Sequence, residues 1–154
     1  MKRKLLVIVI ISIMLFTANI GSIPASATEI YTIESYETIY PRFDNVNQCT
    51  FTFQILSPGE AHVGVTYYAK SDVFVQSKLT VKIQKKFLGL FWMTVDINEP
   101  NNEWISISDR VNGYFYNSFP VNGTGTYRAI FTVEITGING TTDIIEDTIE
   151  FKYN

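Results

Sequence analysis

The stretch GTYRAIFTVEITGING, residues 125–140, decides the fold. Apolar side chains occupy every second position, a period typical of a strand with one buried face, because successive side chains of a strand point to opposite faces. Asn139-Gly140 then predicts a hairpin, since both turn positions need a positive φ, and Ile144, Ile145, Ile149 and Phe151 supply the returning strand. The alternating residues are Tyr127, Ala129, Phe131, Val133 and Ile135.

Similar short apolar alternations, separated by turn signals, precede this stretch. They comprise Phe51, Phe53 and Ile55; Ala61, Val63, Val65 and Tyr67; Leu79, Val81 and Ile83; residues 92–97; and Trp104, Ile105 and Ile107. Strands spaced roughly 8–12 residues apart predict an all-β sandwich. Tyr127, two residues before Ala129, also resembles the tyrosine corner of immunoglobulin-like domains. We therefore expect an immunoglobulin-like antiparallel β-sandwich of seven to eight strands.

The first 27 residues differ in character from the rest. Lys2, Arg3 and Lys4 precede a nearly unbroken apolar run over residues 5–20, and Ala25-Ser26-Ala27 places small residues where a signal peptidase cleaves. This order is typical of a secretory signal peptide. Retention of the segment as a membrane anchor is the alternative. We expect a helical signal peptide over 1–27 that is cleaved after Ala27, an N-terminal arm over 28–48, a sandwich domain over 49–154, and secretion of the mature chain.

A wider resemblance involves LTVKIQKK (residues 79–86), a glycine turn, Trp92, GTYR (residues 125–128) and a glycine-containing hairpin. The combination resembles a group of small, largely uncharacterised secreted β-sandwich proteins of Gram-positive bacteria. The likeness covers residues 49–151. It implies a signal peptide followed by one small β-sandwich, and it implies no particular activity.

Charge and motifs exclude several functions. Without residues 1–27, nine basic and 15 acidic residues remain, a net charge of −6. Nucleic acids and anionic lipids both attract concentrated positive charge, and the largest basic cluster of the mature chain is Lys85-Lys86, so neither is an expected partner. Phosphate-binding glycine loops are missing from the sequence. The single cysteine, Cys49, shares the parity of Phe51 and Phe53 and is expected in the core rather than as a reactive or dimer-forming thiol.

Catalysis is not expected. His62, the only histidine, has the parity opposite Val63 and Val65 and should face solvent, and no nucleophile motif is present. One histidine and one cysteine are too few for a zinc site. Carboxylates are available for a hydrolase, which remains a minor alternative. We predict no catalytic residue and no cofactor.

The loop over residues 96–103 is rich in oxygen donors, the ligands that calcium prefers. Its spacing does not match an EF-hand, and turns select asparagine and proline for backbone reasons. A solvated loop is expected, with calcium as the alternative. The candidate ligands are Asp96, Asn98, Glu99, Asn101 and Glu103.

Aromatic residues suggest two binding surfaces. Tyr114 and Tyr116 share one face of a strand, opposite Phe115, and with Trp104 they are candidates for stacking on sugar rings. Filling of the core or of an interface is the alternative. Residues 87–93 form the most hydrophobic stretch of the mature chain. They either form an exposed tip that docks on a membrane or partner, through Phe87, Leu90, Phe91 and Trp92, or cap the sandwich with Trp92 in the core.

We therefore expect a small secreted, non-catalytic protein with a binding or accessory role outside the cell or at its surface. Its expected partner is an unidentified protein or glycan. A carbohydrate-binding module and a membrane-active, antimicrobial-type protein are the two alternatives. Membrane contact is not expected once the signal peptide has been removed.

Overall fold

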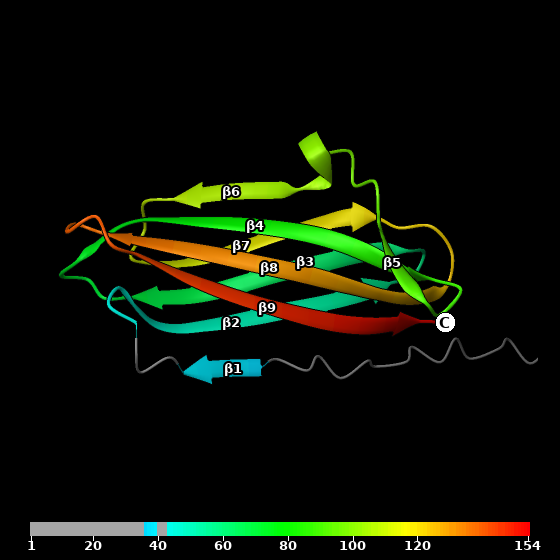
Figure 1. Ribbon diagram of the computed structural model, residues 1–154, viewed down its shortest axis with the longest axis horizontal. Helices are drawn as coiled ribbons and strands as arrows, with labels where there is room; N and C mark the ends of the chain where they lie inside the picture. Colours follow the sequence, from blue (N-terminus) through cyan, green and yellow to red (C-terminus); the bar gives the residue numbers. More distant parts are fainter. Residues whose placement is uncertain (1–35, 40–42) are drawn as a thin grey trace, which may run out of the picture. The chain divides into compact units, whose positions relative to one another are not determined.

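A computed structural model describes residues 36–39 and 43–154, with the backbone alone for residues 36–39. The predicted signal peptide and most of the predicted N-terminal arm lie outside this part of the chain. Within it the structure is all-β and consists of two antiparallel sheets (Figure 1). None of the helices in the described residues is long and apolar enough to cross a membrane.

The first sheet has four strands, in the order β1-β2-β3-β7. They are β1 (Tyr36–Ile39), β2 (Val46–Leu56), β3 (Glu60–Ala69) and β7 (Asn112–Pro120). The sandwich therefore begins before the expected residue 49, since β2 starts at Val46 and β1 pairs with it. The polar arm also suggests a short edge strand near residues 30–33, and this segment lies outside the described residues.

The second sheet has the order β5-β4-β8-β9, and β6 also pairs with β4. The strands are β4 (Phe74–Phe87), β5 (Phe91–Thr94), β6 (Trp104–Ser108), β8 (Gly125–Gly137) and β9 (Thr142–Tyr153). A short 3-10 helix, Pro100–Asn102, lies between β5 and β6. Figure 1 shows β4, β8 and β9 running side by side. The described residues thus form nine strands, more than the seven or eight expected, because β1 was not anticipated at its observed position.

The core consists of the inward side chains that the alternation predicted. Phe51 of the first sheet, for example, contacts Phe131 of the second, with ring centroids 5.3 Å apart. Cys49 is completely buried, as expected, and burial raises the pKa of its thiol to about 12. A buried thiol that holds its proton is unreactive.

Tyr127 anchors the turn that precedes β8. Its ring is completely buried, and its hydroxyl donates to the backbone oxygens of Asn122 at 2.7 Å and Gly123 at 2.6 Å. The phenol therefore satisfies two carbonyl groups of the loop between β7 and β8. This contact holds the middle of that loop against the sheet.

Candidate functional site

The outward side chains of β2, β3 and β7 in the first sheet carry almost no charge. We call the outward side chains of β2, β3 and β7 the tyrosine face, since side chains of a strand alternate between core and outside. Its members are Gln48, Thr50, Thr52, Gln54 and Leu56 of β2; Glu60, His62, Gly64, Thr66 and Tyr68 of β3; and Asn112, Tyr114, Tyr116, Ser118 and Pro120 of β7. Within this set Glu60 is the only carboxylate, and the set contains no lysine or arginine.

The outer face of the second sheet is quite different. It carries Lys78, Lys82 and Lys86 on β4, Arg128 and Glu134 on β8, and Glu146, Glu150 and Lys152 on β9. Lys78 and Glu134, for example, form an ion pair at 2.7 Å. Mixed charge of this kind is what keeps an exposed sheet soluble. The tyrosine face therefore lacks the side chains that normally serve this purpose, and it presents hydroxyls, amides and aromatic rings instead.

Tyr114 and Tyr116 lie on β7, an edge strand of the first sheet, and give the tyrosine face its most exposed aromatic rings. Their side chains are exposed by 63% and 51%, and their rings are nearly parallel, with an interplanar angle of 18° and centroids 6.0 Å apart. Burial against the sheet, followed by the proximity of Tyr116, raises the pKa of the Tyr114 phenol above its usual range. The Tyr114 phenol thus carries its proton at neutral pH and can donate as well as accept a hydrogen bond.

Gly64 makes room for this arrangement. A Cβ at this position would lie 3.2 Å from the Tyr114 hydroxyl and 2.6 Å from Oγ1 of Thr52. The missing side chain therefore lets the phenol of Tyr114 lie close over the backbone of β3. A bulkier residue would lift the ring away from the sheet.

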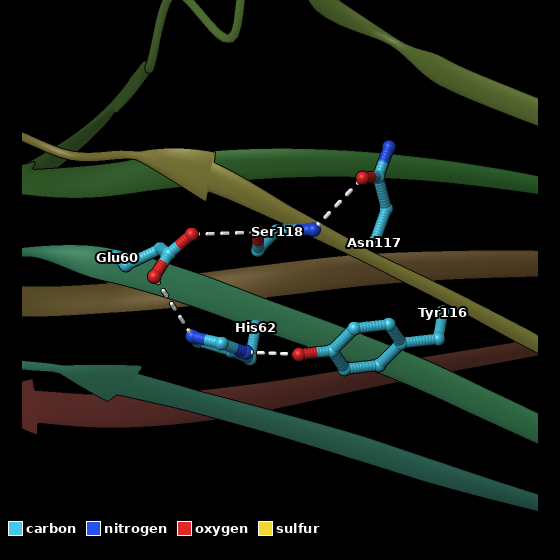
Figure 2. Close-up of polar contacts among 5 residues, drawn as sticks. All are labelled: Glu60, His62, Tyr116, Asn117 and Ser118. Atoms are coloured by element: carbon cyan, nitrogen blue, oxygen red, sulfur yellow. Dashed lines mark hydrogen bonds and ion pairs between the residues drawn. The ribbon is translucent and has the colours of Figure 1, made fainter.

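Polar side chains from β3 and β7 join in a chain of contacts beside Tyr116 (Figure 2). The Tyr116 hydroxyl meets Nδ1 of His62, and Nε2 of the same imidazole faces Oε2 of Glu60 at 3.4 Å. Ser118 then donates its hydroxyl to Oε1 of Glu60 at 2.8 Å. This chain holds the Tyr116 ring in place, because each of its members is fixed by the next.

His62 has the outward parity expected from the sequence, but its surroundings were not anticipated. Its side chain is only 15% exposed, because the Tyr116 ring lies against it with centroids 5.8 Å apart. Strand pairing explains the contact, since His62 lies opposite Ser118 and Gly64 lies opposite Tyr116. The i, i+2 spacing of Glu60 and His62 was the only sequence signal for this cluster.

The cluster joins polar groups of two neighbouring strands, because the hydroxyl of Ser118 on β7 bonds to the carboxylate of Glu60 on β3 and the ring of Tyr116 lies against the imidazole of His62. The arrangement orients a phenol and an imidazole at a surface, which suits binding.

The third residue expected to stack on sugars, Trp104, does not join the tyrosine face. It belongs to β6 of the second sheet, is half-buried, and packs edge-on against Phe119 with centroids 5.9 Å apart. Core filling therefore accounts for Trp104. The pair Tyr114 and Tyr116 is the part of that candidate set that the structure brings together.

Two of the calcium candidates, Asp96 and Glu103, have partners within the protein. Glu103 forms an ion pair with Lys82 at 2.6 Å, and Oδ1 of Asp96 accepts the backbone N–H of Asn98 at 3.0 Å. Asn98 and Asn101 have φ angles of 59° and 57°, which asparagine tolerates well. In the described residues, no three acidic, histidine or cysteine side chains gather as metal ligands would. Turn geometry explains this loop.

Residues 87–93, which we call the apolar tip, form the hairpin between β4 and β5. Leu88 and Leu90 are exposed by 76% and 79%, and the side chains of Phe87, Phe91 and Met93 are about half exposed. The alternative that placed Trp92 in the core is wrong. Trp92 lies on the outer face, where the guanidinium carbon of Arg128 is 4.3 Å from its ring centroid and Nζ of Lys86 is 5.3 Å away.

The chain matches no protein-family model, and no curated protein is similar to it.

Proposed function

We propose that this is an exported, non-catalytic binding protein whose tyrosine face binds neutral glycans. The observation that carries the proposal is the composition of that face: two exposed, nearly parallel tyrosine rings on a surface of hydroxyl and amide groups with one carboxylate. Export is supported by the signal-peptide pattern of residues 1–27. The expected partner is thus outside the cell or at its surface.

Neutral sugars match this chemistry well. A pyranose ring has an apolar C–H face that packs on an aromatic ring, and hydroxyls at its edge that need donors and acceptors. Tyr114 and Tyr116 supply the rings. Thr66 lies opposite Tyr114 on β3, and Thr52 and Gln54 add polar groups on β2, the next strand of the face. An acidic polysaccharide would instead require basic residues, which this face lacks.

Preorganisation also supports binding at this face. Tyr116 is held by His62, and the phenol of Tyr114 lies over Gly64. Side chains that are already ordered lose little conformational entropy when a ligand arrives. A flat sheet face fits an extended or crystalline glycan better than a small free sugar, because a small ligand needs a concave pocket.

We further propose that the sandwich is immunoglobulin-like. Strands β2, β3 and β7 follow the order A-B-E of that fold, and β4, β8 and β9 follow the order C-F-G. The hydroxyl of Tyr127 bonds to the backbone four and five residues upstream, as in a tyrosine corner. The equivalent of the core cysteine is Ala129, so a member of this class must rely on its core for stability.

The test is a pull-down of the secreted protein with insoluble neutral polysaccharides (cellulose, chitin, xylan and starch), with pectin as the acidic comparison. Tyr114→Ala and Tyr116→Ala should each reduce affinity about tenfold, which corresponds to an aromatic contact of roughly 1–1.5 kcal/mol. Phe91→Ala is the matched control, since it removes an aromatic ring of similar exposure from the apolar tip. It should leave glycan binding unchanged.

Two results would contradict the proposal. One is the absence of binding to every neutral polysaccharide in the panel. The other is binding that Phe91→Ala weakens as much as the tyrosine variants do, since the tyrosine face would then not be the site.

A further inference from the structure

We propose that the apolar tip is a second binding site, and that it inserts into the surface of an anionic lipid bilayer. This site lies on the second sheet and is independent of the tyrosine face.

The tip exposes apolar side chains in every direction. Phe87, Phe91 and Met93 have the parity of the core-facing residues, whereas Trp92 lies on the outer face of the sheet. Leu88 and Leu90 are the most exposed residues of the tip and lie at its turn. Gly89 between them faces open space, since no atom outside its chain neighbours lies within 4 Å of a Cβ placed there. A flat protein partner would cover one side of such a hairpin. A fluid apolar medium covers all of it.

The tip is ordered before it binds. The rings of Phe87 and Phe91 contact each other across the hairpin, with centroids 5.3 Å apart, and Leu90 donates its backbone N–H to the oxygen of Phe87 at 3.0 Å. The base of the hairpin is not fully packed against the sandwich. A pocket remains there, and its lining includes Phe87, Met93, Val95 and Tyr127. The apolar residues are thus presented by a firm hairpin that stands off the sandwich.

Leu88 is strained where a turn would normally carry glycine or asparagine. Its φ is 49°, in the left-handed region that leucine avoids, and its side chain contributes little packing because it is 76% exposed. Local folding therefore does not explain a leucine at this position. Strain of this kind persists where the side chain serves another purpose, and here its exposed apolar surface is what it contributes.

Basic residues surround the tip. Lys86 and Arg128 flank Trp92, Lys85 precedes Phe87, and Lys152 lies on the neighbouring end of β9. Glu150, opposite Arg128, and Asp96, in the pocket below, are the acidic residues of this region. The excess of positive charge is local, since the predicted mature chain has a net charge of −6. With apolar side chains at the end of the hairpin and basic side chains nearer the sandwich, the apolar groups can contact the acyl chains of a bilayer while the basic groups contact its anionic headgroups.

The experiment must separate the tip from the apolar segment at residues 5–20, which could bind vesicles by itself. Leu90→Cys and Ile138→Cys each place one reactive thiol at an exposed turn, at opposite ends of the second sheet. The native Cys49 is buried and does not compete for label. Each variant of the full chain is labelled with an environment-sensitive nitrobenzoxadiazole dye. The probes are vesicles of phosphatidylcholine alone and of phosphatidylcholine with phosphatidylglycerol.

We expect the dye at position 90 to shift to the blue and to be quenched by bilayer-embedded quenchers, with vesicles that contain phosphatidylglycerol. The dye at position 138 should report water throughout. In unlabelled protein, Leu88→Asn combined with Phe91→Ser should weaken vesicle binding at least tenfold, whereas Ile138→Ser should not change it.

Three outcomes would overturn the proposal. In the first, bound vesicles leave the dye at position 90 in water, so that binding is due to another segment. In the second, both dyes enter the bilayer, or vesicles of phosphatidylcholine alone bind equally well. In the third, the dye at position 90 is shielded only when a protein partner is added. None of these results bears on glycan binding by the tyrosine face.

Discussion

The backbone N–H of Asn45 donates to Oδ2 of Asp143 across 2.6 Å, and this bond ties the start of β2 to the start of β9, 98 residues later. The same carboxylate accepts the N–H groups of Val46 at 3.1 Å and Asp44 at 3.3 Å. One buried side chain therefore satisfies three successive backbone donors at the start of β2. The contact joins the two sheets at the end opposite the apolar tip.

Replacing Asp143 with alanine should lower the free energy of unfolding by about 3 kcal/mol or more, because buried N–H groups left without acceptors are costly. Urea denaturation measures the change. Asp147→Ala is the matched control on the same strand, since that carboxylate accepts the N–H of its neighbour Thr148. If the two variants lose similar amounts, Asp143 is not the tie between the sheets.

Tyr127→Phe should destabilise the protein by about 1 kcal/mol, since the ring still fills the core while the hydroxyl no longer donates to the loop carbonyls, which keep the ammonium of Lys85 as a donor. Thermal unfolding followed by circular dichroism measures this. Tyr68→Phe removes a hydroxyl from a ring that is 45% exposed and should have no measurable effect. Equal melting temperatures for wild type and Tyr127→Phe would contradict the anchoring role of this phenol.

Leu88→Gly should stabilise the fold by roughly 0.5–1 kcal/mol, because glycine adopts a positive φ without steric conflict. The same substitution should weaken vesicle binding if the apolar tip inserts into lipid. Chemical denaturation and vesicle co-sedimentation on one protein preparation measure both effects. A destabilised Leu88→Gly variant would show that the leucine contributes to folding after all.

Gly64→Ala should lower glycan affinity without removing any aromatic group. The new methyl group would meet the Tyr114 hydroxyl and Thr52, so the ring must shift. Combining it with Thr52→Ala relieves the closer of the two contacts and should recover part of the stability, but not the position of the ring. Binding assays on the polysaccharide retained by wild type test this, and unchanged affinity would show that the position of Tyr114 is immaterial.

Alkaline pH should destabilise the protein partly through Cys49. Burial raises the pKa of this thiol from 9.0 to about 12, so above pH 9 the unfolded chain releases the proton while the folded chain keeps it. The stability that the protonated thiol contributes is fully present below pH 9 and is lost progressively up to about pH 12. Over this range the free energy of unfolding falls by about 1.4 kcal/mol per pH unit through this one group. In Cys49→Ala, the free energy of unfolding should therefore fall less steeply between pH 9 and 12 than in wild type, by that slope. Parallel profiles would mean that the thiol ionises within the fold.

Much of the sandwich was predictable from alternation alone. In β3, β4 and β8 the apolar residues recur at every second position, and each of these strands buries the face that the pattern predicts. The outward parity of His62 and the shared face of Tyr114 and Tyr116 followed from the same rule. Alternation states which face a residue joins, but it does not state which strand lies beside it.

Pairing between strands decided the rest. Glu60, His62, Tyr116 and Ser118 meet because β3 lies beside β7, a register that links residues more than 50 positions apart. Trp92 and Trp104 each lie in a short apolar alternation of the sequence. In the structure Trp92 lies on the outer face between two cations, whereas Trp104 packs against the core. Whether the apolar tip was exposed could not be predicted either, because that depends on where the first sheet ends.

The sequence by itself thus determined an all-β chain, the buried faces of its main strands and a signal-peptide pattern ahead of them, because these follow from local periodicity and composition. Only the tertiary structure decided that the tyrosines lie on an almost uncharged surface and that the apolar tip has no covering strand. Both depend on which strands become neighbours. That choice is made by the packing of two whole sheets, which no short stretch of sequence contains.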